Sequence, residues 1–103
     1  MVLSIGLYIL NKQEKQYYDQ IARLGCILCI TFGYFDTPCE IHHIRRFGGK
    51  RSLADVIGLC PEHHRGNTGI HGLGRKNFER TYNLTENTLL EKTKYLLEKG
   101  LNK

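Results

Sequence analysis

The side chains best suited to bind metal ions or move protons gather in one part of the sequence. All five histidines lie between Cys39 and His71, and Cys26 and Cys29 stand shortly before them. Thiolate and imidazole groups are the ligands that Zn²⁺ and related ions favour, and imidazole has the ordinary pKa closest to neutral. This stretch can therefore provide both metal binding and acid–base chemistry.

Two pairs of residues have the spacing of a structural zinc site. Cys26 and Cys29 form a C-x-x-C pair, and Cys60 and His63 form a C-x-x-H pair further along the chain. Tetrahedral zinc takes four sulfur or nitrogen ligands, and one short turn presents two of them. We expect a structural Zn²⁺ on these four side chains, with free buried cysteines as the alternative.

Cys39 is the cysteine outside these pairs. It can replace His63 or another ligand of the zinc site. We favour a small buried residue at the start of a strand, which is the usual environment of an unpaired cysteine.

The other histidines indicate a second site. His42 and His43 are neighbours in a predicted strand, so their side chains leave it on opposite sides and do not easily share one ion. One can bind a metal while the other transfers protons, as metal-assisted hydrolysis requires. His64 points away from His63 on a helix, and His71 can fold back toward the same ion. The alternatives are extra zinc ligands or a polar surface.

Hydrophobic periodicity and chain breakers predict the elements that position these residues. Predicted helices span residues 11–24, 61–66, 75–82 and, capped by Thr85, 86–99. Predicted strands span residues 40–47 and 52–59, on either side of a turn at 48–50. A loop or short hairpin at 31–38 and a glycine-rich loop at 67–74 connect them. In the last helix we expect the leucines and Tyr95 to pack against the core.

Length and charge limit the class of protein. A chain of 103 residues has room for one domain, and a core this small gains much from a bound metal. The net charge of +5 and the pI of about 9.1 suit a polyanionic partner without identifying one. The apolar segment 2–10 is too short to cross a bilayer and lacks the features of a signal peptide. We expect a strand or docking arm there, and a reducing, cytoplasmic location.

Three segments together carry a recognisable motif. They are Ile41-His42-His43-Ile44, Gly48-Gly49 and Leu59-Cys60-Pro61-Glu62-His63-His64. In this order they resemble the HNH, or ββα-metal, nuclease motif. The resemblance implies an α+β fold with a ββα-metal core, stapled by the structural zinc and flanked by helices. It divides the single domain, 1–103, into an arm and helix at 1–25, the knuckle and core at 26–74, and C-terminal helices at 75–99.

The resemblance also implies roles for individual side chains. His43 is the general base, His42 is a metal ligand and His64 is the ligand that closes the motif. The family's last ligand often follows three or four residues later, where this chain has Asn67 and Thr68, and we expect His71 to serve instead. Asp55 stands where the family has an asparagine that braces the hairpin and orients the base. An aspartate can accept a hydrogen bond from His43 but cannot donate one.

The catalytic ion and its surroundings are less closely specified. Glu40 precedes His43 by three residues on the strand, and we expect it to assist the site without binding the ion itself. Three imidazoles favour Zn²⁺ or another transition ion, whereas the family resemblance implies Mg²⁺. The working metal is therefore Mg²⁺, Mn²⁺ or Zn²⁺.

A longer pattern narrows the resemblance. It comprises Cys39-Glu-Ile-His-His-Ile-Arg45, the run from His63 to Gly72, and Phe78-Glu-x-x-Tyr82. Over about residues 20–98 the chain is similar to the Ref family of phage-type, RecA-dependent HNH nucleases. This similarity implies DNA as substrate, a RecA-type recombinase filament as partner, and phage-type recombination inside a bacterial cell.

More than half of the chain's 15 Lys and Arg residues lie around these motifs. We expect them to contact the phosphate backbone without reading bases, so that sequence specificity is low. A solvated basic face is the alternative. The residues are Arg45, Arg46, Lys50, Arg51, Arg65, Arg75, Lys76 and Arg80.

The sequence thus predicts a small metal-dependent HNH endonuclease that hydrolyses DNA phosphodiester bonds. The alternative is a non-catalytic zinc-ribbon module that binds DNA or assists recombination. Metal content separates them, because the nuclease needs about two ions per chain and the binding module one. The sequence leaves the oligomeric state open.

Overall fold

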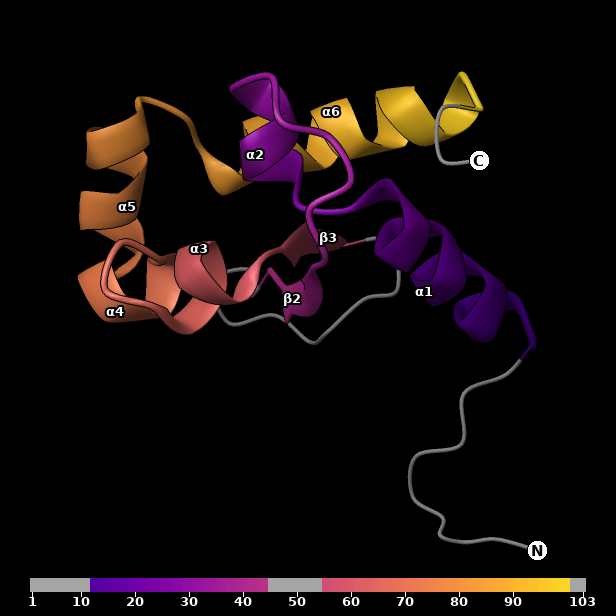
Figure 1. The fold of residues 1–103 in the computed structure, drawn as a ribbon, viewed down its shortest axis with the longest axis horizontal. Helices are drawn as coiled ribbons and strands as arrows, with labels where there is room; N and C mark the ends of the chain where they lie inside the picture. Colours follow the sequence, from indigo (N-terminus) through magenta and orange to yellow (C-terminus); the bar gives the residue numbers. More distant parts are fainter. Residues whose placement is uncertain (1–11, 45–54, 101–103) are drawn as a thin grey trace, which may run out of the picture.

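The computed structural model describes residues 12–44 and 55–100. Within these ranges the chain alternates helices with a two-stranded sheet (Figure 1). The elements are α1 Lys12–Leu24, α2 Ile27–Thr31, β2 Glu40–His43, β3 Val56–Leu59, α3 Pro61–Arg65, α4 Ile70–Leu73, α5 Arg75–Tyr82 and α6 Glu86–Glu98.

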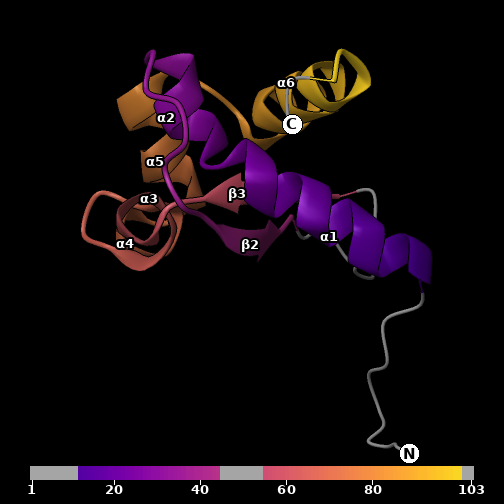
Figure 2. The ribbon, with the colours of Figure 1, turned by 45° about the vertical axis from the view of Figure 1, so that its right-hand side comes forward.

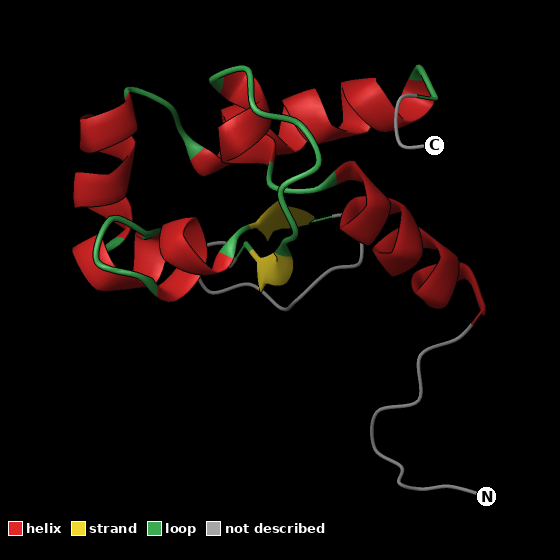
Figure 3. Ribbon diagram, viewed as in Figure 1, coloured by secondary structure: helices red, strands yellow, loops and turns green. Residues whose placement is uncertain are grey.

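The sheet lies in the middle of the described structure. β2 and β3 pair antiparallel, with Glu40 opposite Leu59 and His43 opposite Val56. Helix α1 lies at one end of the sheet, and the short helices α3, α4 and α5 lie at the other, in both views (Figures 1 and 2). Helix α2 packs against α6, and the strands lie between the helices (Figure 3). The described part of the chain is thus a small α+β domain.

The core forms around β3, whose four residues are all buried. Ile27 and Leu28 of α2, Phe78 of α5 and Leu89 of α6 pack with this strand and have no exposed surface. β2 is less buried: His42 is its one buried side chain, and Ile44, which directly follows the strand, is buried as well. Burying apolar surface on β3 from several sides therefore brings residues distant in the sequence toward the two strands.

Helix boundaries follow local sequence signals. α1 ends at Gly25, whose φ of +90° is readily adopted only by glycine. A Cβ there would also stand 2.8 Å from the carbonyl oxygen of Thr37. α6 begins after Thr85, whose hydroxyl accepts a hydrogen bond from the backbone N–H of Thr88 at 3.0 Å. These ends lie where the sequence predicts them.

The glycine-rich segment 67–74 differs from its prediction. It is not wholly a loop, because Ile70–Leu73 forms the one-turn helix α4. The backbone N–H of Leu73 donates to Gly69 at 2.8 Å, and that of Gly74 donates to Ile70 at 2.9 Å. Ile70 is buried at 4% exposure. Its burial stabilises a turn that glycine-rich composition disfavours.

Other predictions had mixed outcomes. Thr31 ends α2, and residues 32–38 form a turn and a loop without strands. β2 begins at Glu40 as predicted, and Ile44 extends the pairing by donating to the Asp55 carbonyl at 2.8 Å. The 48–50 turn and the arm at 2–10 lie outside the described residues. The prediction for Tyr95 is wrong, because this side chain is 56% exposed.

None of the described helices combines the length and the apolar character needed to cross a membrane.

Truncating Phe78 tests how much α5 depends on the core. Phe78→Ala would leave a cavity at a fully buried position, so we expect a loss of about 3–5 kcal/mol in the free energy of unfolding. The matched control Tyr95→Ala removes an exposed ring and should change it by less than about 0.5 kcal/mol. Denaturant unfolding monitored by circular dichroism measures both, and equal losses would contradict this account of the core.

Candidate metal centres

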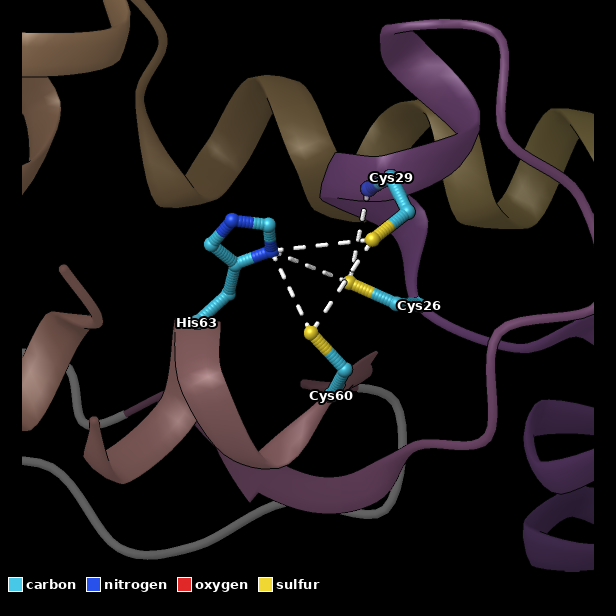
Figure 4. Close-up of side chains that lie close together, drawn as sticks. All are labelled: Cys26, Cys29, Cys60 and His63. Carbon is cyan, nitrogen blue, oxygen red and sulfur yellow. Dashed lines mark hydrogen bonds between the residues drawn. The ribbon is translucent and has the colours of Figure 1, made fainter.

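Two segments bring three thiols and one imidazole together. Cys26 caps the N-terminus of α2, and its Sγ accepts a hydrogen bond from the backbone N–H of Cys29 at 3.4 Å. Cys60 immediately precedes α3, which opens at Pro61 and carries His63 one turn later. Figure 4 shows the three sulfurs and His63 Nδ1 turned toward one another. We call this group the cysteine-rich centre.

The spacing of these atoms suits a tetrahedral ion. Bond lengths of Zn–S and Zn–N imply separations of about 3.8 Å between two sulfurs and about 3.6 Å between sulfur and nitrogen. Cys29 Sγ lies 3.9 Å from Cys60 Sγ and 3.7 Å from His63 Nδ1. The distances from His63 Nδ1 to Cys26 and Cys60 are 3.8 and 3.3 Å. The cysteine-rich centre can therefore hold a metal such as zinc with little rearrangement.

Burial disfavours the charged thiolate, so the thiolate form of this centre requires a bound cation. It raises the pKa of the Cys26 thiol to about 12 and lowers the pKa of His63. His63 is therefore a neutral imidazole with a lone pair to donate near pH 7. Without an ion Cys26 would remain protonated, whereas a bound divalent cation deprotonates its thiol ligands.

Cys39 lies outside this group. Its Sγ donates to the carbonyl oxygen of Ile21 at 3.5 Å, and burial raises its pKa to about 11. Cys39 was predicted as a small buried residue at the start of the strand; it directly precedes β2 and is partly buried against the core. It sits against Gly58, where an added Cβ would lie 2.5 Å from its sulfur.

Three histidines from three elements form a second group. His42 of β2, His64 of α3 and His71 of α4 each offer a ring nitrogen, and these atoms lie within 4.8 Å of one another. Their ring centroids are 4.8 to 5.4 Å apart. This arrangement, which we call the three-histidine centre, can hold a metal ion. It unites the three histidines that the sequence predicts as ligands of a second ion.

Close packing of α4 on α3 places His71 in this group. A Cβ on Gly69 would lie 2.5 Å from backbone atoms of Glu62 and His63, and one on Gly72 would lie 2.1 Å from the Gly66 carbonyl oxygen. Only glycine fits at these two positions without moving the backbone. This close packing brings the His71 ring to the His64 ring. Burial lowers the pKa of His71, and the imidazoles of His64 and His42 lower it further.

Two carboxylates contact the three-histidine centre from outside. Glu86 Oε2 lies 2.8 Å from His42 Nε2, and Glu40 Oε1 lies 2.8 Å from His64 Nδ1. Arg65 also donates two hydrogen bonds to Glu40 Oε2, at 2.8 and 3.0 Å. These bonds from Arg65 and His64 lower the pKa of Glu40 to about 2. Glu40 thus contacts a predicted ligand, His64, rather than the predicted base. Glu86 was not predicted, because its only sequence signal is a place in the first turn of a helix.

His43 occupies the other side of β2 from His42. Its Nε2 lies 3.1 Å from the hydroxyl oxygen of Tyr18, and the two rings meet edge to face with centroids 6.2 Å apart. Tyr18 lies on α1, and no spacing rule in the sequence connects it to His43. Asp55, the predicted brace, extends the strand pairing through its carbonyl oxygen; a side-chain hydrogen bond to His43 stays a prediction.

A cavity of about 520 Å³ opens beside both histidines of β2. The three-histidine centre and His43 share its wall with Arg75 and Glu86. The lining residues are Ile41, His42, His43, His64, Ile70, His71, Gly74, Arg75 and Glu86. A predicted proton acceptor and a candidate ion site therefore face one space that is open to a ligand.

Basic side chains lie near this cavity. Arg65 is paired with Glu40, and Arg75 approaches Glu79 at 3.7 Å. Their side chains are 67% and 56% exposed, and Lys76 is exposed beside Arg75. Among the other predicted DNA contacts, Arg80 is exposed on α5 and donates to Asn77 Oδ1 at 3.3 Å. Arg45, Arg46, Lys50 and Arg51 lie outside the described residues.

These features define a small α+β protein with two candidate metal centres, one beside a cavity. Residues 11–98 match the family described as recombination enhancement, RecA-dependent nuclease. The match covers most of the chain, so the protein belongs to this family. The family description indicates a nuclease that acts in recombination and depends on RecA, which confirms the resemblance seen in the sequence at this level. No match was found among curated proteins or among solved structures.

Replacing one thiol tests the cysteine-rich centre. Cys60→Ser removes one of three thiol ligands, and we expect it to weaken the thiolate-to-metal absorption of the Co²⁺-substituted protein and to destabilise the fold, because such sites contribute folding energy. Cys39→Ser is the matched control, since Cys39 stands outside the centre. It should retain the absorption at full intensity. Loss of the band in Cys39→Ser but not in Cys60→Ser would reverse the assignment.

Proposed function

We propose that the protein is a metal-dependent HNH endonuclease that hydrolyses DNA phosphodiester bonds with low sequence specificity during RecA-dependent, phage-type recombination inside a bacterial cell. The observation that carries this proposal is the arrangement of the three-histidine centre and His43 around one cavity. The family match supports the nuclease class. The catalytic roles are inferred from the positions of the side chains.

The proposed ββα-metal core comprises β2, β3 and α3. The strands supply His42 and His43, and the helix supplies His64. The cysteine-rich centre fixes the junction of β3 with α3, because Cys60 lies between them. In this proposal its zinc is structural, and the three-histidine centre holds the catalytic ion.

The division of labour follows from the contacts. A divalent cation on His42, His64 and His71 would stabilise negative charge on the phosphate and on the leaving 3′ oxygen. His43 would accept a proton from water, and the contact of its Nε2 with the Tyr18 hydroxyl, at 3.1 Å, would orient the ring. Tyr18 thereby assumes part of the orienting role that the sequence assigns to Asp55. Metal binding and proton transfer require separate side chains. Successive side chains of β2 leave the strand on opposite sides, so His42 can bind the ion while His43 transfers the proton.

DNA would lie along the open side of the cavity. Arg75 lines it, and Lys76 and Arg65 are exposed nearby. Such side chains attract the phosphate backbone regardless of sequence. Glu40 binds Arg65 closely, at 2.8 Å, whereas Glu79 approaches Arg75 only to 3.7 Å, so we assign Arg75 and Lys76 the larger share of the described contacts.

Removing the proposed base tests catalysis. His43→Ala should lower the rate of plasmid nicking by about 10²–10⁴-fold while DNA binding and fold persist. The assay is run with and without a RecA filament, and acceleration by the filament is expected. Unchanged cleavage in His43→Ala would refute the assignment of the base.

Metal counting supplies the control for that experiment. Both wild type and His43→Ala should hold about two ions per chain, because His43 is not a ligand in this proposal. A wild-type protein that holds one ion and cleaves no DNA would instead be a zinc-bound accessory module.

Removing one hydroxyl tests the role of Tyr18. Tyr18→Phe keeps the ring but loses a hydrogen bond worth about 0.5–1.5 kcal/mol, so we expect a roughly 2- to 10-fold lower cleavage rate at saturating DNA. Tyr17→Phe is the matched control, because the buried Tyr17 hydroxyl has no hydrogen-bond partner among the described residues. That control should cleave at the wild-type rate. A Tyr18→Phe variant that does the same would remove Tyr18 from the mechanism.

A further inference from the structure

We propose that Glu86 is a positioning residue of the three-histidine centre. Its carboxylate fixes His42 in the tautomer whose Nδ1 can bind the ion. The role in catalysis rests on the proposed function, whereas the hydrogen bond between Glu86 and His42 can be tested independently of it. Glu86 is 44 residues from His42 in the sequence and lies on a different element.

The geometry of the contact sets the tautomer. Glu86 Oε2 lies 2.8 Å from His42 Nε2, and the two side chains are only 11% and 6% exposed. A carboxylate accepts hydrogen bonds and cannot donate them, so Nε2 carries the proton that it donates. In the tautomer that donates from Nε2, the lone pair is on Nδ1. Because the contact is buried, water competes poorly for either partner.

The start of α6 holds the carboxylate in place. Thr85 caps the helix, and the backbone N–H of Glu86 itself donates to Glu79 Oε2 at 2.9 Å. The unsatisfied N–H groups of a first helical turn favour negative charge there. The carboxylate is therefore presented to His42 by an ordered helix end, anchored to α5 through Glu79.

Glu86 acts through His42 rather than as a ligand. The group whose ligand atoms lie within 4.8 Å of one another consists of the three histidines. The second carboxylate, Glu40, contacts Nδ1 of His64, whereas Glu86 contacts Nε2 of His42. His64 would thus present Nε2 where His42 presents Nδ1. Such carboxylate–histidine contacts fix ring orientation and raise the basicity of the ligating nitrogen.

Metal affinity provides the first test. Protein with zinc in the cysteine-rich centre is titrated with Mn²⁺, and free Mn²⁺ is followed by electron paramagnetic resonance. We expect Glu86→Ala to weaken Mn²⁺ binding about 10- to 100-fold. Glu86→Gln, which keeps an acceptor but loses the charge, should fall between Glu86→Ala and wild type. Glu91→Ala, an exposed position on the same helix, should bind as wild type does.

Nuclear magnetic resonance provides the second test. In protein without Mn²⁺, the ¹⁵N shifts of His42 should report Nε2–H in wild type and Glu86→Gln, and a mixture of tautomers in Glu86→Ala. The spectra also show whether each variant is folded. An Nδ1–H tautomer in wild type, or wild-type Mn²⁺ affinity in folded Glu86→Ala, would overturn the proposal. If wild type itself binds no Mn²⁺, Mn²⁺ is excluded as the working ion of the proposed function, while the spectra still decide whether Glu86 sets the tautomer.

Discussion

The convergence of three thiols and one imidazole on one point is the constraint on which the rest of the structure depends. Cys29 and Cys60 are 31 residues apart, yet their sulfurs lie 3.9 Å apart. An ion at that point joins α2 to the start of α3, and β3 runs directly into Cys60. A chain of this size buries a small core, so such a link would contribute a large share of its stability. The positions of β3 and α3 follow from it, and with them the positions of the histidines.

The carboxylates that contact the three-histidine centre come from two elements far apart in the sequence. α6 supplies Glu86 to His42, and β2 itself supplies Glu40 to His64. Both histidines are thereby oriented by carboxylates, whereas His71 is held by the close backbone packing of α3 and α4. Arg65 compensates the charge of Glu40 at the surface. The two contacts differ in environment, since the pair with Glu86 is buried and the pair with Glu40 is open to solvent on one side.

The sequence predicts those features that depend on near neighbours. The C-x-x-C and C-x-x-H pairs, the end of α1 at Gly25 and the cap at Thr85 are all set within a few residues, and each lies where predicted. The helix α4 was missed because burial of Ile70 outweighs glycine composition, a balance that only the folded core determines. Glu86 and Tyr18 were missed because their partners lie 44 and 25 residues away. Long-range partners of this kind leave no periodic trace along a single chain.

The adjacency of His63 and His64 has a consequence for assembly. One belongs to the cysteine-rich centre and the other to the three-histidine centre, so a single turn of helix serves both. In the proposed function, zinc on the thiols holds this helix where its next residue, His64, can meet His42 and His71. On the proposed function, a newly synthesised chain is therefore inert until it acquires zinc, and uptake of the two ions is ordered. Binding of zinc would then control binding of the catalytic ion, so that the proposed nuclease could not cleave DNA before its fold is complete.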